Sequence, residues 1–544
     1  VKEIFYTYDI YGNPTVLMNK GDVSLSSDDT ILVVTYVTNL LLWVMDTPSE
    51  VTLYDGQNNI VKRTQYYYDG QGGGKVTKGL LSSQQDYYST FSSITTSQEY
   101  DSYGNVIAAK DGKGNAVKYT YDSTHTFPLS VTNALGHVTT TTYDLGMGNV
   151  LSETDANGFS TTYEYDVFGR LKKVITPYDS SGYPTVLYEY GVDGKAPEIV
   201  TMKQREVSGA MGTYDSMLVY DGFGQVVQVQ KEGVSGMIVG DIFYDGLGRV
   251  VSESNLYFTV GLGGYVTPQV VASRTYSYDS FSSVISVKNP DGLQRMQEYI
   301  GSKMIETDEN GNKKQYLFDG FNRILEVMEK DGNKVYVTSY TYRADGALVK
   351  VVDSAQNVFG FTYDLLGRLL ELNDPDLGVW KYNYDANGNM VEQNMNGKVI
   401  TQTFDSLNRV LSKNSGGEKV TYSYDQGTKG VLTGVSTNLA DKKYGYDSRL
   451  RLTSEEKSID GMKFNTIYAY DAMNRVTTIK QQGEDVSYGY SGQNTLNALN
   501  LNAKNIVTIA PNVMGQPVTR TYGNAAVSGM AYNLQNYRLQ EIKT

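Results

Sequence analysis

A short phrase of Tyr or Phe, Asp, two variable residues, Gly or Asn, and then Arg or Gln returns along most of this chain. It reads FTYDLLGRLL at 361–370 and recurs as YDVFGRL, YDGFGQV, YDGLGRV, FDGFNRI, FDSLNRV and YDAMNRV. Tyr, Thr and Val favour extended backbone, whereas Asp, Gly and Asn accept turn dihedral angles and local side-chain hydrogen bonds. Each copy therefore predicts a strand, a tight turn and a second strand.

The copies are regularly spaced, and the spacing sets the size of the repeating unit. About twenty residues hold two strands of six or seven residues and two tight turns, which is one β-hairpin. A second turn lies between copies, as in TDANG at 154–158 and TDENGN at 307–312, where Asp, Asn and Gly tolerate positive φ. The chain is predicted to alternate two turn types, one on each edge of a sheet. The interval is 20 to 24 residues between the successive anchors Tyr363, Tyr384, Phe404, Tyr424, Tyr446, Tyr470 and Tyr490.

An apolar pair three residues apart follows several of these turns. Leu369 is followed by Leu372, and Val476 by Ile479. Because strand side chains alternate with a period of two, an interval of three predicts a β-bulge or a change of face just after the turn.

Composition supports an all-β fold with little or no helix. The chain has 55 Gly and 47 Tyr but 11 Pro among its 544 residues, and Thr and Val are abundant. Open sheets rarely exceed about ten strands before their twist curls them, so a hairpin array of this length cannot stay flat. The predicted fold is one long curled sheet, either a spiral or a hollow, cocoon-like shell.

Three regions are expected along the chain: a lead-in β segment at 1–65, the repeat region at 66–490, and degenerate repeats at 491–544. Longer inserts at Thr176–Thr185, Met202–Thr213 and Leu256–Pro268 are interpreted as loops. The apolar run Thr30–Met45 contains polar residues and is too short to cross a bilayer, so it predicts buried strands. The chain starts at Val1 without Met and stops at Thr544 within the pattern, so we expect a segment of a longer protein. Sheet edges exposed at its ends predict that the isolated piece aggregates or pairs with more chain.

Charge and residue content argue against several functions. The net charge is −13 and no basic block occurs, which disfavours nucleic-acid binding. The chain has no Cys and only two His, His125 and His137, which leaves little basis for a Cys or His catalytic triad or a usual zinc site. The recurrent Asp is better explained as a turn former, since glycoside hydrolysis needs one carboxylate pair and these form a row. No enzymatic activity and no cofactor are expected.

Calcium binding was the alternative for two acidic turns. Asp308–Asn312 and Asp385–Asn389 space oxygen atoms alternately, as calcium loops do, but neither has Gly at loop position six or Glu at position twelve. They are interpreted as plain turns, and no metal is expected.

These phrases resemble the YD-repeat, or Rhs, family. The lead-in is similar to the region where the repeats begin in the B component of insecticidal Tc toxins, with YDIYGNPT at 8–15, Trp43 and TPSEVTLYDGQNN at 47–59. In that family the repeats form a hollow β-shell around a C-terminal effector, and teneurins use a similar shell on animal cells. The Asp-Pro and Gly-rich Rhs core with its self-cleaving aspartates is not found here, and Asp374-Pro375-Asp376 is interpreted as a turn.

The resemblance implies a structural shell segment of a large secreted or cell-surface bacterial protein that encapsulates a toxin or other cargo. Implied partners are the rest of its own longer polypeptide, an enclosed C-terminal effector and other toxin-complex subunits, with no nucleic acid and no membrane-spanning segment. The alternative is a surface adhesin or fibre module that binds glycans, although Tyr at a fixed hairpin position is first a packing residue. The residues predicted to be structural repeat anchors are Tyr165, Asp166, Gly169, Arg170, Tyr220, Asp221, Tyr244, Asp245, Gly248, Arg249, Phe318, Asp319, Arg323, Tyr363, Asp364, Gly367, Arg368, Phe404, Asp405, Arg409, Tyr470, Asp471 and Arg475.

Overall fold

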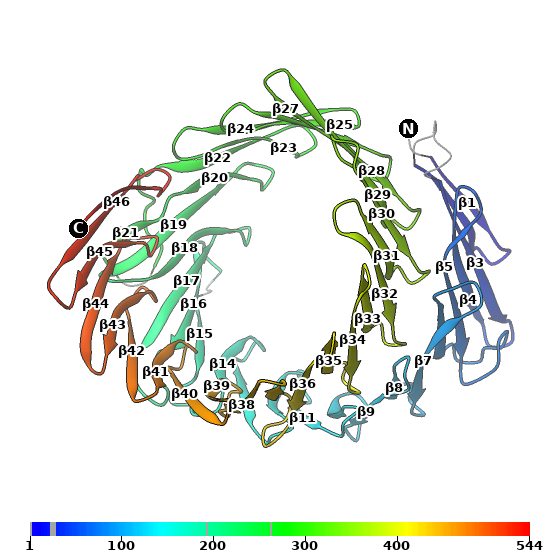
Figure 1. The fold of residues 1–544 in the computed structure, drawn as a ribbon, viewed down its shortest axis with the longest axis horizontal. Helices are drawn as coiled ribbons and strands as arrows, with labels where there is room; N and C mark the ends of the chain where they lie inside the picture. Colours follow the sequence, from blue (N-terminus) through cyan, green and yellow to red (C-terminus); the bar gives the residue numbers. More distant parts are fainter. Residues whose placement is uncertain (1–2, 22–28, 192–193, 262–263) are drawn as a thin grey trace. The chain divides into compact units, whose positions relative to one another are not determined.

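The described part of the chain consists of β-strands joined by turns. The computed structural model describes residues 3–21, 29–191, 194–261 and 264–544. Within these ranges there are 47 strands and no helix, and Figure 1 labels them in chain order. The predicted all-β array of tandem hairpins is confirmed. Among the described residues no helix has the length and apolar character needed to cross a membrane.

The chain divides into two compact units, and each unit is built from two stretches that are far apart in sequence. Unit 1 comprises residues 1–139 and 298–422, and unit 2 comprises residues 140–297 and 423–544. The expected boundaries near residues 65 and 490 remain a prediction.

Unit 1 contains hairpins from both of its stretches. Its strands are β1 (Glu3–Tyr8), β2 (Pro14–Lys20), β3 (Thr30–Asn39), β4 (Val44–Asp55), β5 (Ile60–Tyr68), β6 (Leu81–Tyr87), β7 (Ser93–Tyr100), β8 (Val106–Lys110), β9 (Ala116–Tyr121), β10 (Pro128–Thr132), β25 (Lys303–Thr307), β26 (Lys313–Phe318), β27 (Ile324–Asp331), β28 (Lys334–Tyr342), β29 (Leu348–Val352), β30 (Val358–Tyr363), β31 (Leu369–Asp374), β32 (Gly378–Tyr384), β33 (Met390–Met395), β34 (Lys398–Phe404) and β35 (Val410–Ser415). The strands that contain the unit boundaries are β11 (Val138–Tyr143), β24 (Gln294–Ile300) and β36 (Glu418–Tyr424).

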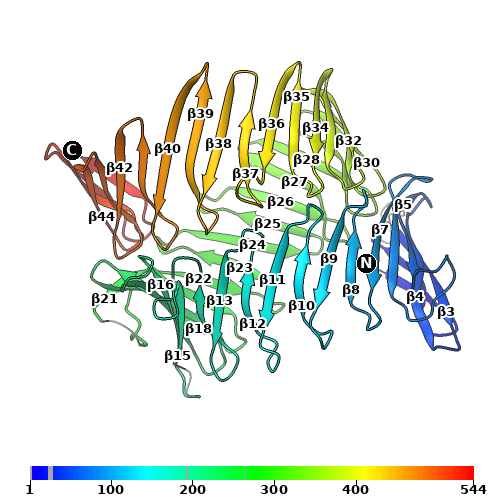
Figure 2. The ribbon, with the colours of Figure 1, turned by 90° about the horizontal axis from the view of Figure 1, so that it is seen from below.

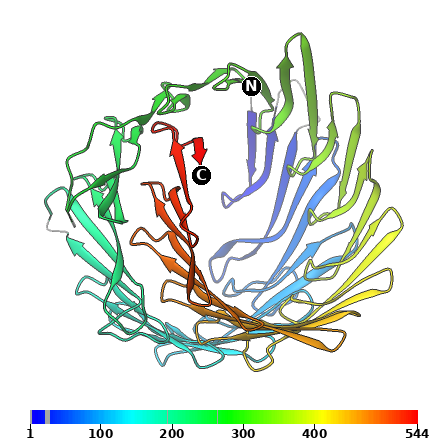
Figure 3. The same cartoon turned by 60° about the vertical axis from the view of Figure 1, so that its left-hand side comes forward.

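Unit 2 has the same organisation. Its strands are β12 (Val150–Thr154), β13 (Ser160–Tyr165), β14 (Leu171–Ile175), β15 (Val186–Gly191), β16 (Glu198–Arg205), β17 (Thr213–Tyr220), β18 (Val226–Gly233), β19 (Gly236–Tyr244), β20 (Val250–Ser254), β21 (Tyr257–Thr259), β22 (Ser273–Tyr278), β23 (Val284–Lys288), β37 (Leu432–Ser436), β38 (Ala440–Tyr446), β39 (Leu452–Ile459), β40 (Met462–Tyr470), β41 (Val476–Gln481), β42 (Glu484–Tyr490), β43 (Leu496–Leu501), β44 (Lys504–Pro511), β45 (Pro517–Tyr522), β46 (Val527–Tyr532) and β47 (Leu539–Lys543). Figure 3 shows β38–β47 in orange and red as one run of hairpins.

Neighbouring strands pair antiparallel, and the pairing shifts at the Tyr-Asp turns. Tyr363 lies opposite Leu369, and Thr362 lies opposite Glu371, so Leu370 is an extra residue on β31. The shift between Ala469 and Tyr470 has the same form. The β-bulge predicted from the apolar interval of three is therefore confirmed, and it lies just after the turn. Such a bulge increases local twist, which lets each hairpin turn relative to the next.

Two of the predicted insert loops are partly wrong because strand residues occupy part of each. The insert at Met202–Thr213 starts inside β16, which continues to Arg205, and ends at the first residue of β17. The insert at Leu256–Pro268 contains β21, which pairs with the first half of β19 while β20 pairs with the second half. Residues 262–263 of this insert lie outside the described residues.

The prediction of buried strands for Thr30–Met45 is also partly wrong. Its first ten residues form β3, but the next four make a turn before β4. Leu41 is 93% exposed and Trp43 is 80% exposed, with a φ of 56° at Trp43. The run is interrupted because β3 and β4 form a long hairpin whose tip carries these apolar side chains.

Fully buried side chains are few in each unit. One small cluster in unit 1 is Val37, Tyr68 and Val76, and one in unit 2 is centred on Met217, Met237 and Val239. Most other strand residues are half-buried or exposed; the two classes alternate in β32, whereas every residue of β39 is half-buried. Cross-strand pairs and hydrogen bonds therefore carry much of the stabilisation, at about 0.2–1 kcal/mol for each side-chain pair.

Candidate functional site

The Asp of the repeated phrase closes its own turn. Asp364 Oδ1 accepts the backbone N–H of Leu366 at 2.9 Å and of Arg368 at 2.8 Å. The backbone N–H of Asp364 donates to the Arg368 carbonyl. The N–H of Gly367, which has a φ of 78°, donates to the backbone carbonyl of Asp364. The carboxylate thus holds the reversal between β30 and β31.

The other predicted Asp anchors make the same pair of bonds, which supports the interpretation of a turn former. The fourth residue of these turns has a positive φ, which explains Gly or Asn there. The acceptors are Asp166, Asp221, Asp245, Asp319, Asp405 and Asp471. The positive-φ residues include Gly169, Gly248, Asn322, Asn408 and Asn474.

The Arg of the phrase neutralises the second carboxylate oxygen. Arg368 Nε donates to Asp364 Oδ2 at 2.6 Å, and the two side chains are 18% and 4% exposed. The N–H of Arg249 and its guanidinium hold the pKa of Asp245 below its ordinary value. The same bond joins Arg170, Arg249, Arg323, Arg409 and Arg475 to their turn aspartates at 2.5–2.8 Å.

The same guanidinium reaches forward to the next repeat. In Arg368 it lies 5.1 Å from the ring centroid of Tyr384 and donates to the Asp385 carbonyl at 3.1 Å. A cation over an aromatic face is attracted by the ring quadrupole. The equivalent ring distances are 4.2 Å for Arg170 and Tyr190, 4.6 Å for Arg249 and Tyr278, 5.0 Å for Arg323 and Tyr342, 5.0 Å for Arg451 and Tyr470, and 4.5 Å for Arg475 and Tyr490.

The Tyr of the phrase reaches in the opposite direction. The hydroxyl of Tyr384 donates to the carbonyl of Leu369, the first residue after the preceding Tyr-Asp turn, at 2.9 Å. Burial raises the pKa of this phenol, as it does for Tyr363. The corresponding donors are Tyr100, Tyr121, Tyr165, Tyr190, Tyr244, Tyr278, Tyr363, Tyr446, Tyr470, Tyr490 and Tyr532.

We define the inter-repeat clasp as this pair of contacts. The guanidinium of one repeat lies over the Tyr ring of the next repeat, and the hydroxyl of that Tyr donates to the backbone carbonyl just after the turn that holds the Arg. Three predicted anchors lack the hydroxyl bond, and Tyr165 and Tyr244 follow turns that have no arginine. Phe318 and Phe404 have no hydroxyl, and within the described ranges Tyr220 makes no hydroxyl bond to a carbonyl. The predicted role of the anchors in stability remains a proposal. The sequence pattern identified the Tyr, Asp and Arg residues but did not predict that each Arg contacts the Tyr of the next repeat. The fixed offset of five residues from Tyr to Arg was a usable signal.

The two acidic turns considered for calcium use their oxygens internally. Asp308 Oδ1 accepts from the N–H of Asn310 and Asn312, and Oδ2 accepts the Asn312 amide at 2.8 Å. Asp385 makes the same bonds with Asn387 and Asn389. Over the described ranges no group of three or more His, Cys, Asp and Glu residues could hold a metal ion.

In unit 1, turns from the two stretches contact each other (Figure 2). Asn387, in the turn after β32, donates to Asp111 Oδ2 at 2.6 Å in the turn after β8. Lys113 bonds Asp385 at 3.2 Å. Gly112 packs so closely on the Ala386 carbonyl that a Cβ would overlap it.

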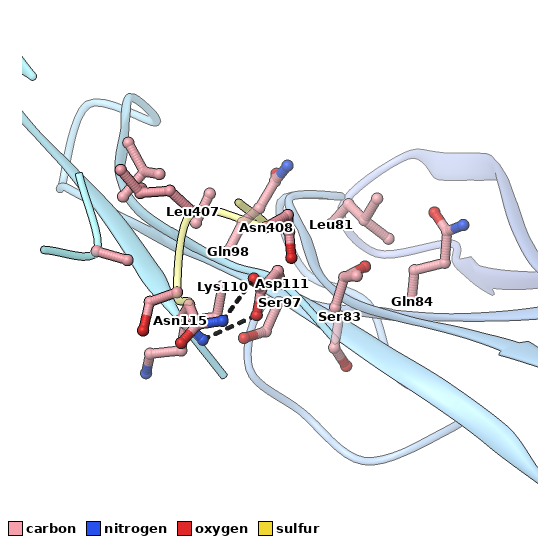
Figure 4. A pocket seen from close by; sticks show the side chains of 15 residues that line it. Leu81, Ser83, Gln84, Ser97, Gln98, Lys110, Asp111, Asn115, Leu407 and Asn408 are labelled. Carbon is pink, nitrogen blue, oxygen red and sulfur yellow. Dashed lines mark hydrogen bonds between the residues drawn. The ribbon is translucent and has the colours of Figure 1, made fainter. Parts of the chain in front are cut away.

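A hollow of about 480 Å³ lies beside this contact (Figure 4). Leu81, Gln98 and Lys110 line it from the first stretch, and Leu407 and Asn408 line it from the second. Asp111, which accepts the Asn387 amide in that contact, is one of its lining residues, so the hollow adjoins the contact.

In unit 2, the sequence inserts receive the later turns. Arg449 Nε donates to the Pro177 carbonyl at 2.7 Å, and its terminal nitrogens bond Asp179 and the Ala472 carbonyl. The second insert supplies Glu206, whose carbonyl accepts the Ala472 N–H at 3.0 Å. The inserts that break the repeat rhythm are therefore docking points between the two stretches of this unit.

These features define a tandem β-hairpin protein whose repeated phrase resembles the YD/Rhs repeat. Residues 361–510 match the family model described as Teneurin YD-shell, and residues 148–181 match the one described as RHS Repeat. The resemblance deduced from the repeated phrase is thereby confirmed over these two segments.

Solved structures extend the likeness to almost the whole chain. The structure entitled Crystal Structure of TcdB2-TccC3 matches with a TM-score of 0.87 at 13% identity, over 99% of this chain and 38% of that one. A Photorhabdus luminescens Tc holotoxin pore structure matches with a TM-score of 0.86 at 13% identity, over 99% and 40%. The protein thus has the fold of that part of these Tc toxins and spans about two fifths of their length. No curated protein matches the chain.

Proposed function

We propose that this chain is a non-enzymatic wall segment of a YD/Rhs-repeat shell that encloses a C-terminal toxin or other cargo of a large secreted or surface bacterial protein. The observation that carries the proposal is the row of inter-repeat clasps within a fold shared with Tc toxins over 99% of the chain. Backbone pairing and clasps make a continuous barrier that keeps cargo from the producing cell until release.

The use of the carboxylates supports a structural role. In each anchor turn the Asp accepts hydrogen bonds from its own turn, and Arg occupies the second oxygen in most copies. A general acid or nucleophile needs a carboxylate that can approach a substrate. These carboxylates are committed to holding turns.

Partners and location follow from the same proposal. The rest of its own longer polypeptide and an enclosed effector would be the direct partners, and toxin-complex subunits would bind the assembled shell. Secretion or surface display would be the setting in which such a container acts.

Electron microscopy of the full-length parent protein, with its C-terminal region present and deleted, tests containment. We expect a hollow particle whose internal density disappears on deletion. An open rod, or a particle without a lumen in both forms, would overturn the proposal.

The second candidate is a glycan-binding adhesin or fibre module, which exposed aromatic side chains at turn tips favour. Phe91 is 94% exposed, Phe223 92% and Phe281 89%. Aromatic rings can stack on sugar faces. A glycan array probed with the parent protein distinguishes the two: binding that is lost on Phe281→Ala would favour adhesion.

A further inference from the structure

The Tyr220–Gln225 turn of unit 2 lacks the arginine that completes the clasp in other repeats. In YDGFGQV the position after Gly224 holds Gln225, whose amide donates to the Gly248 carbonyl at 3.2 Å. Asp221 Oδ1 still accepts the backbone N–H of Phe223 and Gln225, so the turn itself is closed. No residue in the described parts of the chain donates a hydrogen bond to Asp221 Oδ2. One carboxylate oxygen therefore has no cation in the place where Arg368 serves Asp364.

A cavity of about 800 Å³ adjoins this turn. Asp221, Tyr244 and Asp245 are among the residues that line it. Tyr244 is the next anchor after Asp221, and its hydroxyl still bonds the Val226 carbonyl at 2.9 Å. Tyr244, the residue whose ring an arginine at 225 would cover, is thus one of the lining residues. Further aromatic surface comes from Phe223, Phe243 and Tyr265, which are 92%, 42% and 48% exposed.

We propose that this cavity, the Asp221 pocket, binds the arginine side chain of another polypeptide segment. The incoming guanidinium would lie between Asp221 Oδ2 and the face of Tyr244. Six arginines of this chain, five of them in complete clasps, lie in that position at 4.2–5.1 Å from the following ring. The planar guanidinium both stacks on an aromatic face and donates to a carboxylate in fixed geometry, which an ammonium group does less well.

The rest of the cavity indicates which residue types should flank that arginine in the bound segment. A guanidinium fills only part of 800 Å³, and most other lining residues are apolar or aromatic, among them Val227, Ile242 and Pro268. An apolar or aromatic residue beside the arginine would cover them. The net charge of −13 also favours a cationic ligand over an acidic one.

A buried polar network fixes the wall that carries Tyr265. Gln228 donates to Asp241 at 2.6 Å and to the Val266 carbonyl at 2.8 Å, and it accepts the Val266 N–H at 3.0 Å. Tyr257 donates to the other oxygen of Asp241 at 2.8 Å. Gln228 and Asp241 are 0% and 2% exposed. Such satisfied buried groups rigidify their surroundings, so the insert presents a preformed wall.

The test uses the full chain and three acetylated peptides of the form Trp-X-Leu, in which X is arginine, citrulline or lysine. Citrulline keeps the shape of arginine but has no charge. By isothermal titration calorimetry we expect the arginine peptide to bind at least about tenfold more tightly than either of the others, since the charge-assisted contact to Asp221 Oδ2 is lost or distorted. Equal binding of the citrulline peptide would overturn the proposal, and equal binding of the lysine peptide would overturn its preference for guanidinium.

Two variants locate the site. Asp221→Asn should weaken arginine-peptide binding about tenfold, whereas Asp144→Asn, a turn aspartate outside the cavity, should leave it unchanged. Gln225→Arg should fill the pocket with the chain's own guanidinium, abolish peptide binding and raise the melting temperature. Full binding by Gln225→Arg in a folded protein would refute the assignment. The outcome is independent of whether the shell encloses cargo.

Discussion

Arg449 and Asp179 form an ion pair at 2.7 Å, with side chains 7% and 0% exposed, although 270 residues separate them in sequence. Removing one partner of a buried pair leaves an uncompensated charge, which costs about 3–5 kcal/mol. We expect Arg449→Met to destabilise unit 2 by that amount in chemical denaturation. The double variant Arg449→Met with Asp179→Leu should recover a large part of the loss. Equal destabilisation by the single and double variants would show that the charge pair is not the cause.

The hydroxyls of the anchor tyrosines should each make a small, separable contribution to stability. Tyr363→Phe removes the bond to the Leu348 carbonyl and should cost about 0.5–1.5 kcal/mol. Tyr336, which is 39% exposed, is the matched control, and Tyr336→Phe should change the free energy of unfolding by less than about 0.5 kcal/mol. Chemical denaturation of the two variants is the measurement. Equal free energies of unfolding would show that Tyr363 stabilises the fold through its ring alone and not through its hydroxyl bond.

Close packing between the two stretches of unit 1 can be tested at a glycine. Gly112→Ala would force a methyl group against the Ala386 carbonyl and the Ile94 side chain, at a cost of about 1–3 kcal/mol. Gly72→Ala, where nothing lies within 4 Å, should be nearly neutral. Similar melting temperatures for both variants would argue against this contact in solution.

The acid stability of the protein should depend on Asp69. Burial raises its pKa, but the N–H groups of Thr77, Leu80, Lys78 and Gly79 outweigh this and lower the pKa to about 2, from an ordinary value of 3.8. A carboxylate with a lowered folded pKa adds stability that is present above the unfolded value and is lost as the pH falls through the folded value. The stability difference between the wild type and Asp69→Asn should therefore shrink from pH 4 to pH 2. A difference that stays constant over this window would contradict the role of those bonds.

Tyrosine ionisation should set the alkaline limit. Burial, with the hydrogen bond and charge of Glu153, raises the pKa of Tyr163 to about 12, and burial raises that of Tyr68 to about 12, against an ordinary value of 10.0. Because the folded state holds these protons more tightly, stability is complete below pH 10 and falls as the pH rises toward 12. Circular dichroism and the ultraviolet absorbance of tyrosinate should change together in this range. Ionisation at pH 10 without loss of structure would contradict the prediction.

Local chemistry explains how far sequence reasoning could go. The reversal at Asp364 and the bulge at Leu370 were predictable because a turn and its bulge involve residues within a few positions of each other. The clasp from Arg368 to Tyr384 joins adjacent repeats, so its members were identified without their partners. The pair between Arg449 and Asp179 depends on where the hairpin ribbon returns after 270 residues, which no local pattern encodes. Trp43 was misjudged because hydropathy alone does not distinguish a hairpin tip from a buried strand.

The inter-repeat clasp has a consequence for how such chains change over generations. Each clasp is completed by the adjacent repeat, as Arg368 is completed by Tyr384, so a repeat can be duplicated or deleted as a unit while the cut ends still find equivalent partners. The number of repeats can therefore change without substitution of any single side chain. The exceptions are insert loops such as the one that contains Asp179. A residue in such a loop contacts one partner far away in sequence, so the number of residues between the two must stay the same.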